Sequence, residues 1–352
     1  MSSYSKPFKY VISLAVALVL MWFSFRGVKW DDFIAGLRSC RWEYILLSMA
    51  AGIVAFYLRG LRWRELLMPI DPSIKRITTF NAVNIGYIAN FVFPRIGELV
   101  RCGIIAGNSS FEKAEALADC GGKPERRRLA SYDKVLGTVV LERSWDMLTM
   151  IIFLACLLVF RREKFGSFFA EKMWAPLEKS VSFSVWWLGI SAVVILALII
   201  FLIIRYRRNN AFCSKLFSIC KGLLSGIGSC LRMPRKWLFF AYTALIWGMY
   251  WLMSASTMWA MPDLDVLNIV DALFLMVAGS FGWLVPVPGG FGAFHFIVSL
   301  ALSTIYGIPF EMGIIFATLS HESQAITMAV CGGGSYLYET LKKSPDGNLE
   351  SA

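Results

Sequence analysis

Residues 90–101 read NFVFPRIGELVR, and they interrupt an apolar stretch that runs from residue 80 to residue 106. Pro94 lacks an N–H and disfavours helical geometry at Phe93, so one half-helix is predicted to end there. A second half-helix is predicted to begin near Arg95, with its positive dipole end at the break. Inside a bilayer such a break leaves backbone N–H and C=O groups unpaired, which is tolerated only where protein or a water-filled cavity covers them.

The whole chain has the composition of a membrane protein. Of its 352 residues, 57% are hydrophobic and 17% charged, against roughly 45–50% and 25% in soluble domains. A spanning helix needs about 20 mostly apolar residues, so we expect an all-α polytopic membrane domain over residues 1–352. About six full spans are predicted, at 10–25, 44–59, 136–160, 186–204, 237–260 and 311–331, with two broken segments at 80–106 and 267–306. The first span resembles a signal peptide, but no cleavage site follows it, so we expect a retained helix.

The distribution of positive charge predicts the topology. With a cytoplasmic N-terminus, the segments on the cytoplasmic side carry 23 of the 35 Lys and Arg residues, as the positive-inside rule requires. These segments are residues 1–9, residues 59–79, the basic loops 107–134 and 205–236, and the tail 332–352. The same distribution accounts for the net charge of +11, so nucleic-acid binding is not expected. The KPERRR patch at 123–128 is either a solvated loop or a contact with anionic headgroups.

Both broken segments are predicted to be re-entrant hairpins. The basic flanks of segment 80–106 both belong inside, so we expect it to enter and leave from the cytoplasm. Segment 267–306 lies between two outer loops and is expected to enter from outside, although two full crossings with a tight inner turn fit the charges equally well. Secondary transporters commonly place their site between such inverted elements near the membrane midplane.

Charged residues lie beside the first break. Arg95, Glu98 and Arg101 follow one another at spacings of three, which puts adjacent members on one helix face. Charge at membrane depth is costly and normally faces a partner or an aqueous path. Two arginines with one glutamate leave a net positive site suited to a phosphate or carboxylate. With Asn90 they are candidate ligands of an anionic headgroup; the alternative is a Glu–Arg clamp that holds the hairpin together.

A second charged cluster lies near the start of span 136–160. Glu142 and Asp146 share a helix face at a spacing of four, and Arg143 lies between them in the sequence. Arg143 can pair with Asp146 locally or with Glu98 on another helix. We expect a charge network or a proton-coupling role here, with a purely structural role as the equal alternative.

The second broken segment contains VPVPGGFGAFH at residues 285–295. Its two prolines end a helix, and its three glycines permit a tight turn with close backbone approach. A half-helix that starts near Gly292 would aim N–H groups into the membrane, as in an anion-binding nest. Gly289, Gly290 and Gly292 are therefore further candidate ligands of the headgroup.

The chain has only two histidines, His295 and His321. His295 follows the second break, and His321 lies in the polar run SHESQ at residues 320–324, which also contains Glu322 and Gln324. We expect these four residues to form a charge network or a proton-coupling site, because polar groups at membrane depth are seldom idle; the alternative is a hydrogen-bonded packing role. The eight cysteines show no ligand spacing, and neither a metal nor a cofactor is predicted.

Three motifs, in order, resemble the transmembrane, flippase-type domain of the lysylphosphatidylglycerol synthase family. They are PRIGELVR at 94–101, LERSWD at 141–146 and PVPGGFG at 286–292. Arg62-Trp63 before a basic loop also fits that pattern. The resemblance covers roughly residues 8 to 340 and implies a polytopic lipid-handling domain, found alone or fused to a soluble aminoacyl-transferase.

The chain departs from the family pattern in two ways. It ends soon after the last span, so aminoacyl transfer is not expected on this polypeptide, and a separately encoded enzyme could supply any lipid modification. The family usually shows a glutamate after the PGG motif, where this chain has His295, and often an arginine near the position of His321. We infer that a His pair replaces a Glu–Arg pair, which would make the site titratable near neutral pH.

The sequence thus predicts a lipid translocase, flippase-like or scramblase-like. It would act on an anionic phospholipid or an aminoacyl-lipid in the cytoplasmic (inner) membrane, with both termini in the cytoplasm. The sequence contains no GxxxxGK[ST] phosphate loop, so movement is expected to be passive or ion-coupled. One alternative is an integral membrane enzyme that acts on a lipid phosphate or ester, and another is a membrane subunit without transport activity.

Overall fold

The computed structural model describes residues 5–110, 129–160 and 235–343, with a few isolated positions between them. Contacts divide the chain into two units, residues 1–139 with 237–352, and residues 140–236, and each unit is described by itself. The predicted span 186–204, most of loop 205–236, the KPERRR patch and the tail from residue 344 lie outside the described residues.

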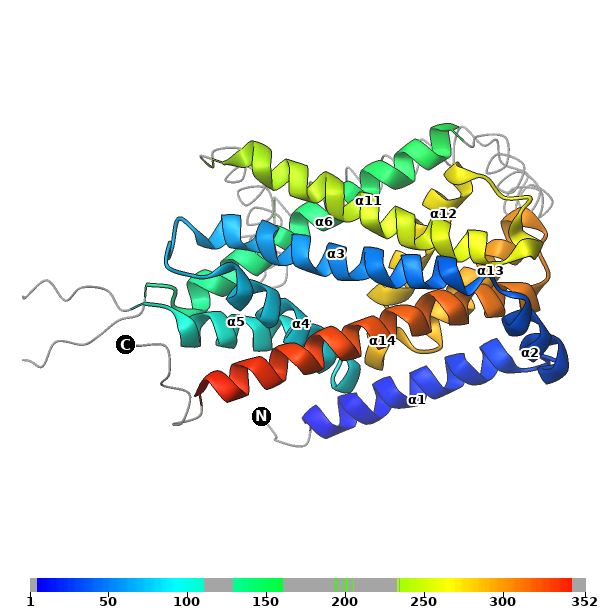
Figure 1. Cartoon of the computed structure of the whole chain (residues 1–352), viewed down its shortest axis with the longest axis horizontal. Helices are drawn as coiled ribbons and strands as arrows, with labels where there is room; N and C mark the ends of the chain where they lie inside the picture. Colours follow the sequence, from blue (N-terminus) through cyan, green and yellow to red (C-terminus); the bar gives the residue numbers. More distant parts are fainter. Residues whose placement is uncertain are drawn as a thin grey trace, which may run out of the picture. The chain divides into compact units, whose positions relative to one another are not determined.

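The described residues are almost entirely helical and contain no strand, which confirms the predicted all-α class. The helices of the first part of the chain are α1 (Ser5–Phe25), α2 (Trp30–Ser39), α3 (Trp42–Leu67), α4 (Arg76–Val92), α5 (Gly97–Asn108) and α6 (Tyr132–Phe160). Those of the last part are α11 (Lys236–Ala260), α12 (Ile269–Leu284), α13 (Ala293–Tyr306) and α14 (Phe310–Lys343), labelled in Figure 1. Short 3₁₀ turns cover Pro262–Leu264 and Pro288–Gly290.

Among the described residues, four helical segments are long and apolar enough to cross a membrane: α3, α6, α11 and Pro288–Tyr306. The pair Val11–Phe25 and Trp30–Ser39, bent by 85°, is a fifth candidate. The predicted spans 44–59, 136–160 and 237–260 are therefore confirmed as membrane-span candidates. The predicted span 311–331 is helical but is not among them, because the polar run at 320–324 interrupts its apolar surface.

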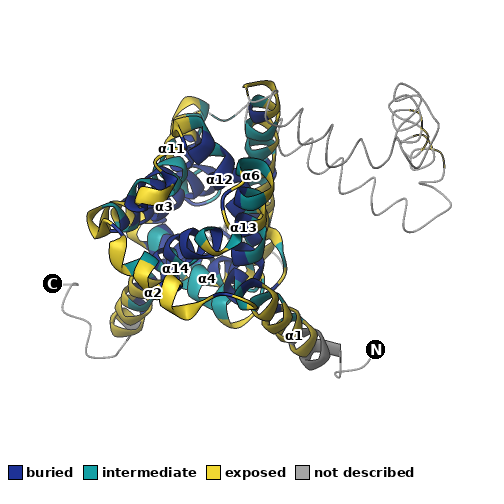
Figure 2. Cartoon of the chain, turned by 90° about the vertical axis from the view of Figure 1, so that its right-hand side faces the viewer, coloured by how far each residue is buried: buried dark blue, intermediate teal, exposed yellow. Residues whose placement is uncertain are grey.

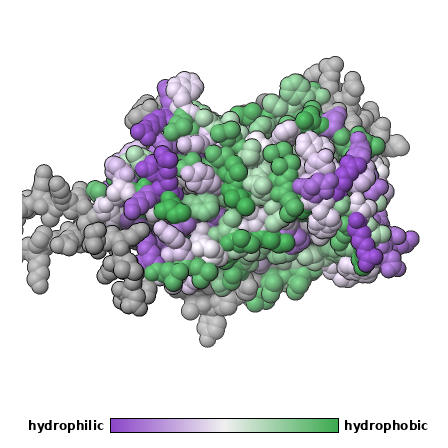
Figure 3. Space-filling model, viewed as in Figure 1, coloured by the Kyte–Doolittle hydropathy of each residue, from purple (hydrophilic) through white to green (hydrophobic). Residues whose placement is uncertain are grey.

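The surface of the first unit has the character of a membrane-embedded protein. Figure 3 shows hydrophobic side chains over the middle of α3 and α14 and hydrophilic side chains toward the two ends of these helices. Large apolar side chains on the outward faces are exposed, as with Leu46 at 66% and Val330 at 68%. Figure 2 shows α12 and α13 largely buried and α1 largely exposed. Apolar exposure of this kind is expected of helices that face lipid.

The first predicted break lies where the sequence placed it. α4 ends at Val92, and Phe93 is extended at φ −128° and ψ 119°, as expected for a residue before proline. Arg95 has a left-handed φ of 63°, and α5 begins at Gly97. Arg95 therefore lies in the turn and not on the helix face that carries Glu98 and Arg101, so the predicted three-residue face was wrong for Arg95.

The two arms of this first hairpin pack closely because glycines lie where they meet. A Cβ atom at Gly97 would overlap the carbonyl oxygen of Gly86. A Cβ atom at Gly86 would in turn lie 2.9 Å from the carbonyl oxygen of Gly97. Small residues that let helix backbones approach this closely are typical of packing in membranes.

The second predicted break is also present. α12 begins with a capping box, in which the Asn268 side chain accepts from the Val270 and Asp271 N–H groups and the Asp271 carboxylate accepts from the Asn268 N–H. It ends at Leu284, before the turn Pro288–Gly290, and α13 starts after Gly292. The positive φ of Gly289 and Gly292, 57° and 74°, explains why glycine is needed in this turn.

The two hairpins point in opposite directions and their tips meet (Figure 1). The open end of the first hairpin lies beside the C-terminal end of α14, where Asn81 donates to Glu339. The open end of the second lies at the other end of α14, to which α13 connects directly. This is the inverted arrangement that the sequence predicted. Re-entry of each hairpin into a membrane stays a prediction.

Candidate functional site

The tips of the two hairpins form what we call the hairpin junction, made by Phe91, Arg95, Trp283, Leu284, Gly289 and Phe291. The Arg95 guanidinium donates from Nη2 to the Leu284 carbonyl oxygen at 2.8 Å. Phe91 contacts Phe291 with ring centroids 6.0 Å apart. The Leu284 carbonyl lies at the C-terminal end of α12, where backbone oxygens lack helical partners and the dipole is negative. A cation from one hairpin thus closes the open helix end of the other.

Arg95 adopts a backbone conformation that non-glycine residues rarely take. Such strain costs about 1–3 kcal/mol and persists only where the surroundings hold it, often at functional sites. Arg95 is also exposed as a whole residue, and the bond to Leu284 is its only hydrogen bond among the described residues. Most of its five N–H donors therefore face the surface of the junction.

Asn90 has a structural contact that the sequence did not indicate. Its Oδ1 accepts a hydrogen bond from the Gly97 N–H at 2.7 Å. The first N–H groups of a helix have no intrahelical partner, and a side-chain oxygen satisfies one of them here. Asn90 therefore ties the end of α4 to the start of α5 and fixes the shape of the first hairpin.

Arg101 lies away from the junction, against α3. Its guanidinium is 4.5 Å from the centroid of the Trp63 ring, and the residue is 3% exposed. Arg95 and Arg101 therefore contact different neighbours, and the anionic-headgroup site predicted from Arg95, Glu98 and Arg101 stays a prediction. Glu98 is half-buried in the first turn of α5, where a carboxylate is favoured by the helix dipole.

Two further buried arginines lie on α3. Arg59 donates to the Tyr250 hydroxyl at 3.1 Å, and Arg62 donates to the Thr243 hydroxyl at 3.4 Å. Both are at most 6% exposed. Both arginines were predicted to lie in the cytoplasmic segment 59–79, because the apolar run ends near residue 59. In the structure the helix continues to Leu67. The spacing of three residues between Arg59 and Arg62, with Trp63 next to them, is the sequence pattern that could have predicted a continued helix with both arginines on one face.

The cluster of Glu142, Arg143 and Asp146 lies on α6, in the second unit. Arg143 and Asp146 form an ion pair with Nη1 and Oδ2 3.9 Å apart, which is one of the two pairings that the sequence left open. Glu142 is fully buried.

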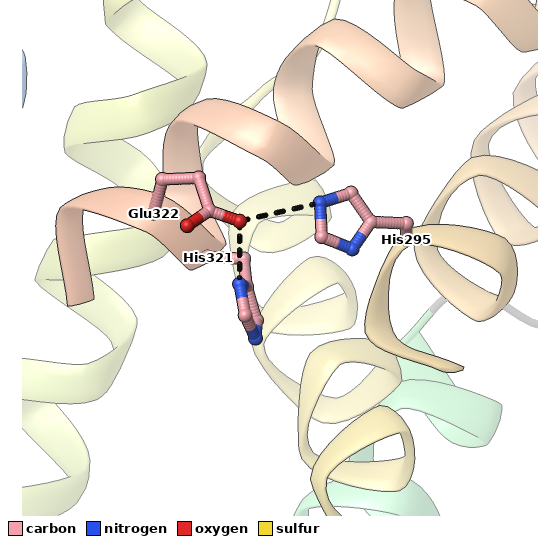
Figure 4. A group of neighbouring side chains, drawn as sticks. All are labelled: His295, His321 and Glu322. Atoms are coloured by element: carbon pink, nitrogen blue, oxygen red, sulfur yellow. Dashed lines mark hydrogen bonds and ion pairs between the residues drawn. The ribbon is translucent and has the colours of Figure 1, made fainter. Parts of the chain in front are cut away.

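Both histidines lie together with Glu322 in what we call the His–Glu cluster, shown in Figure 4. His321 Nδ1 is 3.0 Å from Glu322 Oε1, and His295 Nε2 is 3.7 Å from the same oxygen. His321 Nε2 lies 2.8 Å from the Gly289 carbonyl oxygen, which joins the cluster to the hairpin junction. The expected juxtaposition of the two histidines is thus present, with ring centroids 5.0 Å apart.

Gln324 is not part of this cluster. Its Nε2 lies 3.4 Å from the Ser320 hydroxyl, on the same helix. Of the four residues expected to form one network, the structure thus brings together His295, His321 and Glu322.

Aromatic rings enclose the His–Glu cluster. Trp283 stacks on His321 with centroids 5.1 Å apart and planes 19° apart, and Phe291 and Phe294 contact the same ring. Phe25 of α1 contacts His295. The histidines are 1% and 0% exposed, whereas the Glu322 side chain is 40% exposed. Glu322 is therefore the one member of the cluster that solvent or lipid reaches.

The glycine turn is fixed mainly through its carbonyl groups. His321 contacts the Gly289 carbonyl, and the Ser24 hydroxyl of α1 donates to the Gly292 carbonyl at 3.3 Å. The N–H groups of Gly290 and Phe291 donate within the turn, to Val287 and Pro288. These two N–H groups are thus used within the turn, and the anion-binding nest expected at the start of α13 stays a prediction.

The fold and the hairpin junction define a multi-pass helical membrane protein with two opposed broken helices. The family model of the lysylphosphatidylglycerol synthase TM region matches residues 10–332. The chain therefore belongs to that family, which links it to the handling of membrane lipids. Comparisons with curated proteins and with solved structures gave no match.

Proposed function

We propose that this protein translocates an anionic lipid or a lipid-linked headgroup across the inner membrane, as a flippase or scramblase. One observation carries the proposal: two oppositely directed helical hairpins meet tip to tip at a charged, strained residue. Transporters commonly place their site between broken helices of this kind. Separation of the tips would connect the two sides, and their contact would close the path.

Arg95 is the residue best placed to bind the headgroup. It lies at the tip, is exposed, and has N–H donors beyond the one that meets Leu284. A guanidinium binds phosphate or carboxylate oxygens through two parallel hydrogen bonds. A headgroup that competes with the Leu284 carbonyl for Arg95 would loosen the junction, so binding and opening would be coupled.

The other candidate residues have supporting roles in this proposal. Arg101 is covered by Trp63, so it would meet a headgroup only after α5 moves against α3. Asn90 holds the hairpin through Gly97. Glu98, Gly289, Gly290 and Gly292 would shape the path, and the charges of α6 with His295, His321 and Glu322 would provide ion or proton coupling.

The proposed orientation follows the positive charges, with both termini in the cytoplasm. The first hairpin would then open to the cytoplasm and the second to the outer side. A lipid headgroup would pass along the hairpin junction while its acyl chains stay in the bilayer.

The proposal is tested by transport in reconstituted vesicles that contain a fluorescent anionic phospholipid. The wild-type chain should accelerate exchange between leaflets, and the Arg95→Ala/Arg101→Ala variant should not. Arg95→Gly should also be inactive. Glycine accepts the left-handed φ without strain, so its failure would point to the lost guanidinium and not to the backbone.

Arg38→Ala is the matched control, because Arg38 is an exposed arginine on α2, away from the junction. It should transport as fast as the wild-type chain. Wild-type exchange no faster than that of the Arg95→Ala/Arg101→Ala variant would refute the proposal.

A further inference from the structure

The tautomer of the neutral His321 ring is set by its contact with the glycine turn between α12 and α13. Its Nε2 lies 2.8 Å from the Gly289 carbonyl oxygen. A carbonyl oxygen only accepts hydrogen bonds, so Nε2 must carry the hydrogen. In the neutral ring, Nδ1 then presents a lone pair, and that lone pair lies 3.0 Å from Glu322 Oε1. An ionised carboxylate also presents only lone pairs, so a positive charge must lie between the two atoms.

His295 brings a third ligand atom to the same place. Its Nε2 is 3.7 Å from Glu322 Oε1, and the ligand atoms of all three residues lie within 4.8 Å of one another. A proton between His321 and Glu322 would satisfy those two groups, but His295 Nε2 lies beyond hydrogen-bond distance of Glu322 at 3.7 Å, and the buried His295 Nδ1 has no hydrogen-bond partner among the described residues. A metal ion is the cation that all three groups can share.

We propose that His295, His321 and Glu322 form a binding site for a divalent transition-metal cation of the zinc class (Figure 4). Two imidazoles and one carboxylate are a ligand set that zinc takes in proteins, with a fourth position for water or another oxygen ligand. Four-coordinate zinc with bonds of about 2.0–2.2 Å places its ligand atoms roughly 3.3–3.5 Å apart. Two of the three observed separations, 3.0 and 3.7 Å, lie on either side of that value, and the third, between the two histidine nitrogens, is at most 4.8 Å.

The surroundings of the cluster fit a metal site. The Nε2–H of His321 donates to a backbone carbonyl, the kind of outer contact that orients a metal-binding imidazole through its other nitrogen. Aromatic rings cover the histidines. Glu322 is part-exposed and gives the ion a way in. A bound ion links α14 to α13 beside the hairpin junction. The metal site does not depend on the proposed translocation of lipid.

This site has no sequence motif, because its ligands come from two helices and His295 is 26 and 27 residues from the other two in the chain. Histidine at position 295 pairs with 321 only when the second hairpin folds back along α14. The expectation of no metal rested on the cysteines, which are not involved.

The test is the metal content of the full chain, purified in detergent with an affinity tag that contains no histidine. The wild-type chain, dialysed against zinc and then against buffer, should retain one zinc per chain. His295→Gln, His321→Gln and Glu322→Gln should each weaken zinc binding by about 100-fold or more, since even loss of an outer contact costs roughly 10–100-fold.

Glu311→Gln is the matched control, because Glu311 is an exposed carboxylate in the first turn of the same helix. It should bind zinc as the wild-type chain does. Zinc retention by the wild-type chain no greater than that of the Glu322→Gln variant would overturn the proposal.

A second measurement on the wild-type chain does not depend on how the variants fold. The chain has only two histidines, so nitrogen NMR of histidine-labelled protein reports on this cluster alone. Added zinc should shift the ring signals of both histidines at constant pH. Signals that respond to pH and not to zinc would show that the cluster holds only a proton, and that result would also overturn the proposal.

Discussion

Asp71 lies in the connection between α3 and α4 and is fully buried. Its carboxylate accepts hydrogen bonds from the Ser109 and Ser73 hydroxyls at 2.6 Å each, and from the Ser73 and Ser110 N–H groups. Burial alone would raise the pKa of Asp71, but these hydrogen bonds to the charged form outweigh it and hold the pKa below its usual value. The ionised side chain thus ties this connection to the end of the first hairpin.

This arrangement predicts a pH-dependent contribution to stability. The folded-state pKa lies below the unfolded value of about 3.9, so the stabilisation is present above that value and is lost as pH falls through the folded pKa. Asp71→Asn should lower the free energy of unfolding at pH 7 by about 2 kcal/mol, since hydrogen bonds to charged groups contribute about 1.5–3 kcal/mol. Thermal unfolding in detergent at several pH values would measure the difference, which should shrink below about pH 4.

Asp265→Asn provides the comparison for Asp71→Asn. Asp265 pairs with Arg41, but both side chains are largely exposed, at 58% and 43%. Exposed pairs contribute little, so this variant should unfold as the wild-type chain does. Equal loss in both variants would contradict the role given to Asp71.

At the scale of residues, the sequence predicted the two histidines as a pair, and the structure places their rings in contact. It did not predict the direction of Arg95, which depends on a left-handed φ at the tip of a hairpin. Periodicity assumes a regular helix, and Arg95 lies two residues before the helix begins. The site role of each residue stays a proposal.

Among the elements, the first hairpin depends on a close helix contact at Gly97. A Cβ atom there would overlap the Gly86 carbonyl oxygen and lie 2.8 Å from Asn90 Oδ1. Because backbone atoms cannot give way cheaply, Gly97→Ala should destabilise the protein by about 1–3 kcal/mol or more. Thermal unfolding in detergent would measure it.

Gly103→Ala is the matched control on the same helix. A Cβ atom at Gly103 meets nothing within 4 Å, and alanine favours a helix by up to about 1 kcal/mol over glycine. This variant should be as stable as the wild-type chain or more so. A Gly97→Ala variant as stable as Gly103→Ala would show that the arms of the hairpin do not pack as described.

The elements were predicted well where a local rule decides them. Both breaks were predicted from proline and glycine, because each of these residues interrupts a helix through its own backbone chemistry. The contact between the two tips could not be predicted in the same way, because Arg95 and Leu284 are 189 residues apart. The C-terminal end of α3 was also predicted wrongly. Its last turns carry buried arginines, and charged residues of this kind are typical of a loop.

At the scale of the whole molecule, the proposed orientation predicts that the two ends of the first unit lie on opposite sides of the membrane. Lys75 precedes α4 at the end near the C-terminus of α14, and Arg38 lies at the end of α2, on the other side (Figure 1). Both residues are exposed. In a variant without other cysteines, Arg38→Cys should react in intact cells with a thiol reagent that does not cross the membrane, whereas Lys75→Cys should react only after permeabilisation. The opposite pattern would reverse the proposed orientation.

Composition predicted membrane residence, and the resemblance carried by three ordered motifs predicted the family, which the match over residues 10–332 confirms. The number of spans was harder to predict. Polar residues lower the mean hydropathy of α14, and the bend between α1 and α2 makes it ambiguous whether this pair is one span. A hydropathy average depends only on residue types. It therefore does not show that the second hairpin covers the polar run of α14.

The proposed translocation requires that the two hairpin tips separate when a lipid crosses. Phe91 and Phe291 face each other across the junction, so Phe91→Cys/Phe291→Cys, in a background without other cysteines, allows the tips to be joined by a short cleavable cross-linker. In vesicles with a fluorescent anionic phospholipid, the joined tips should stop lipid exchange and reductive cleavage should restore it. Exchange that continues at the uncross-linked rate while the tips are joined would show that the tips need not separate.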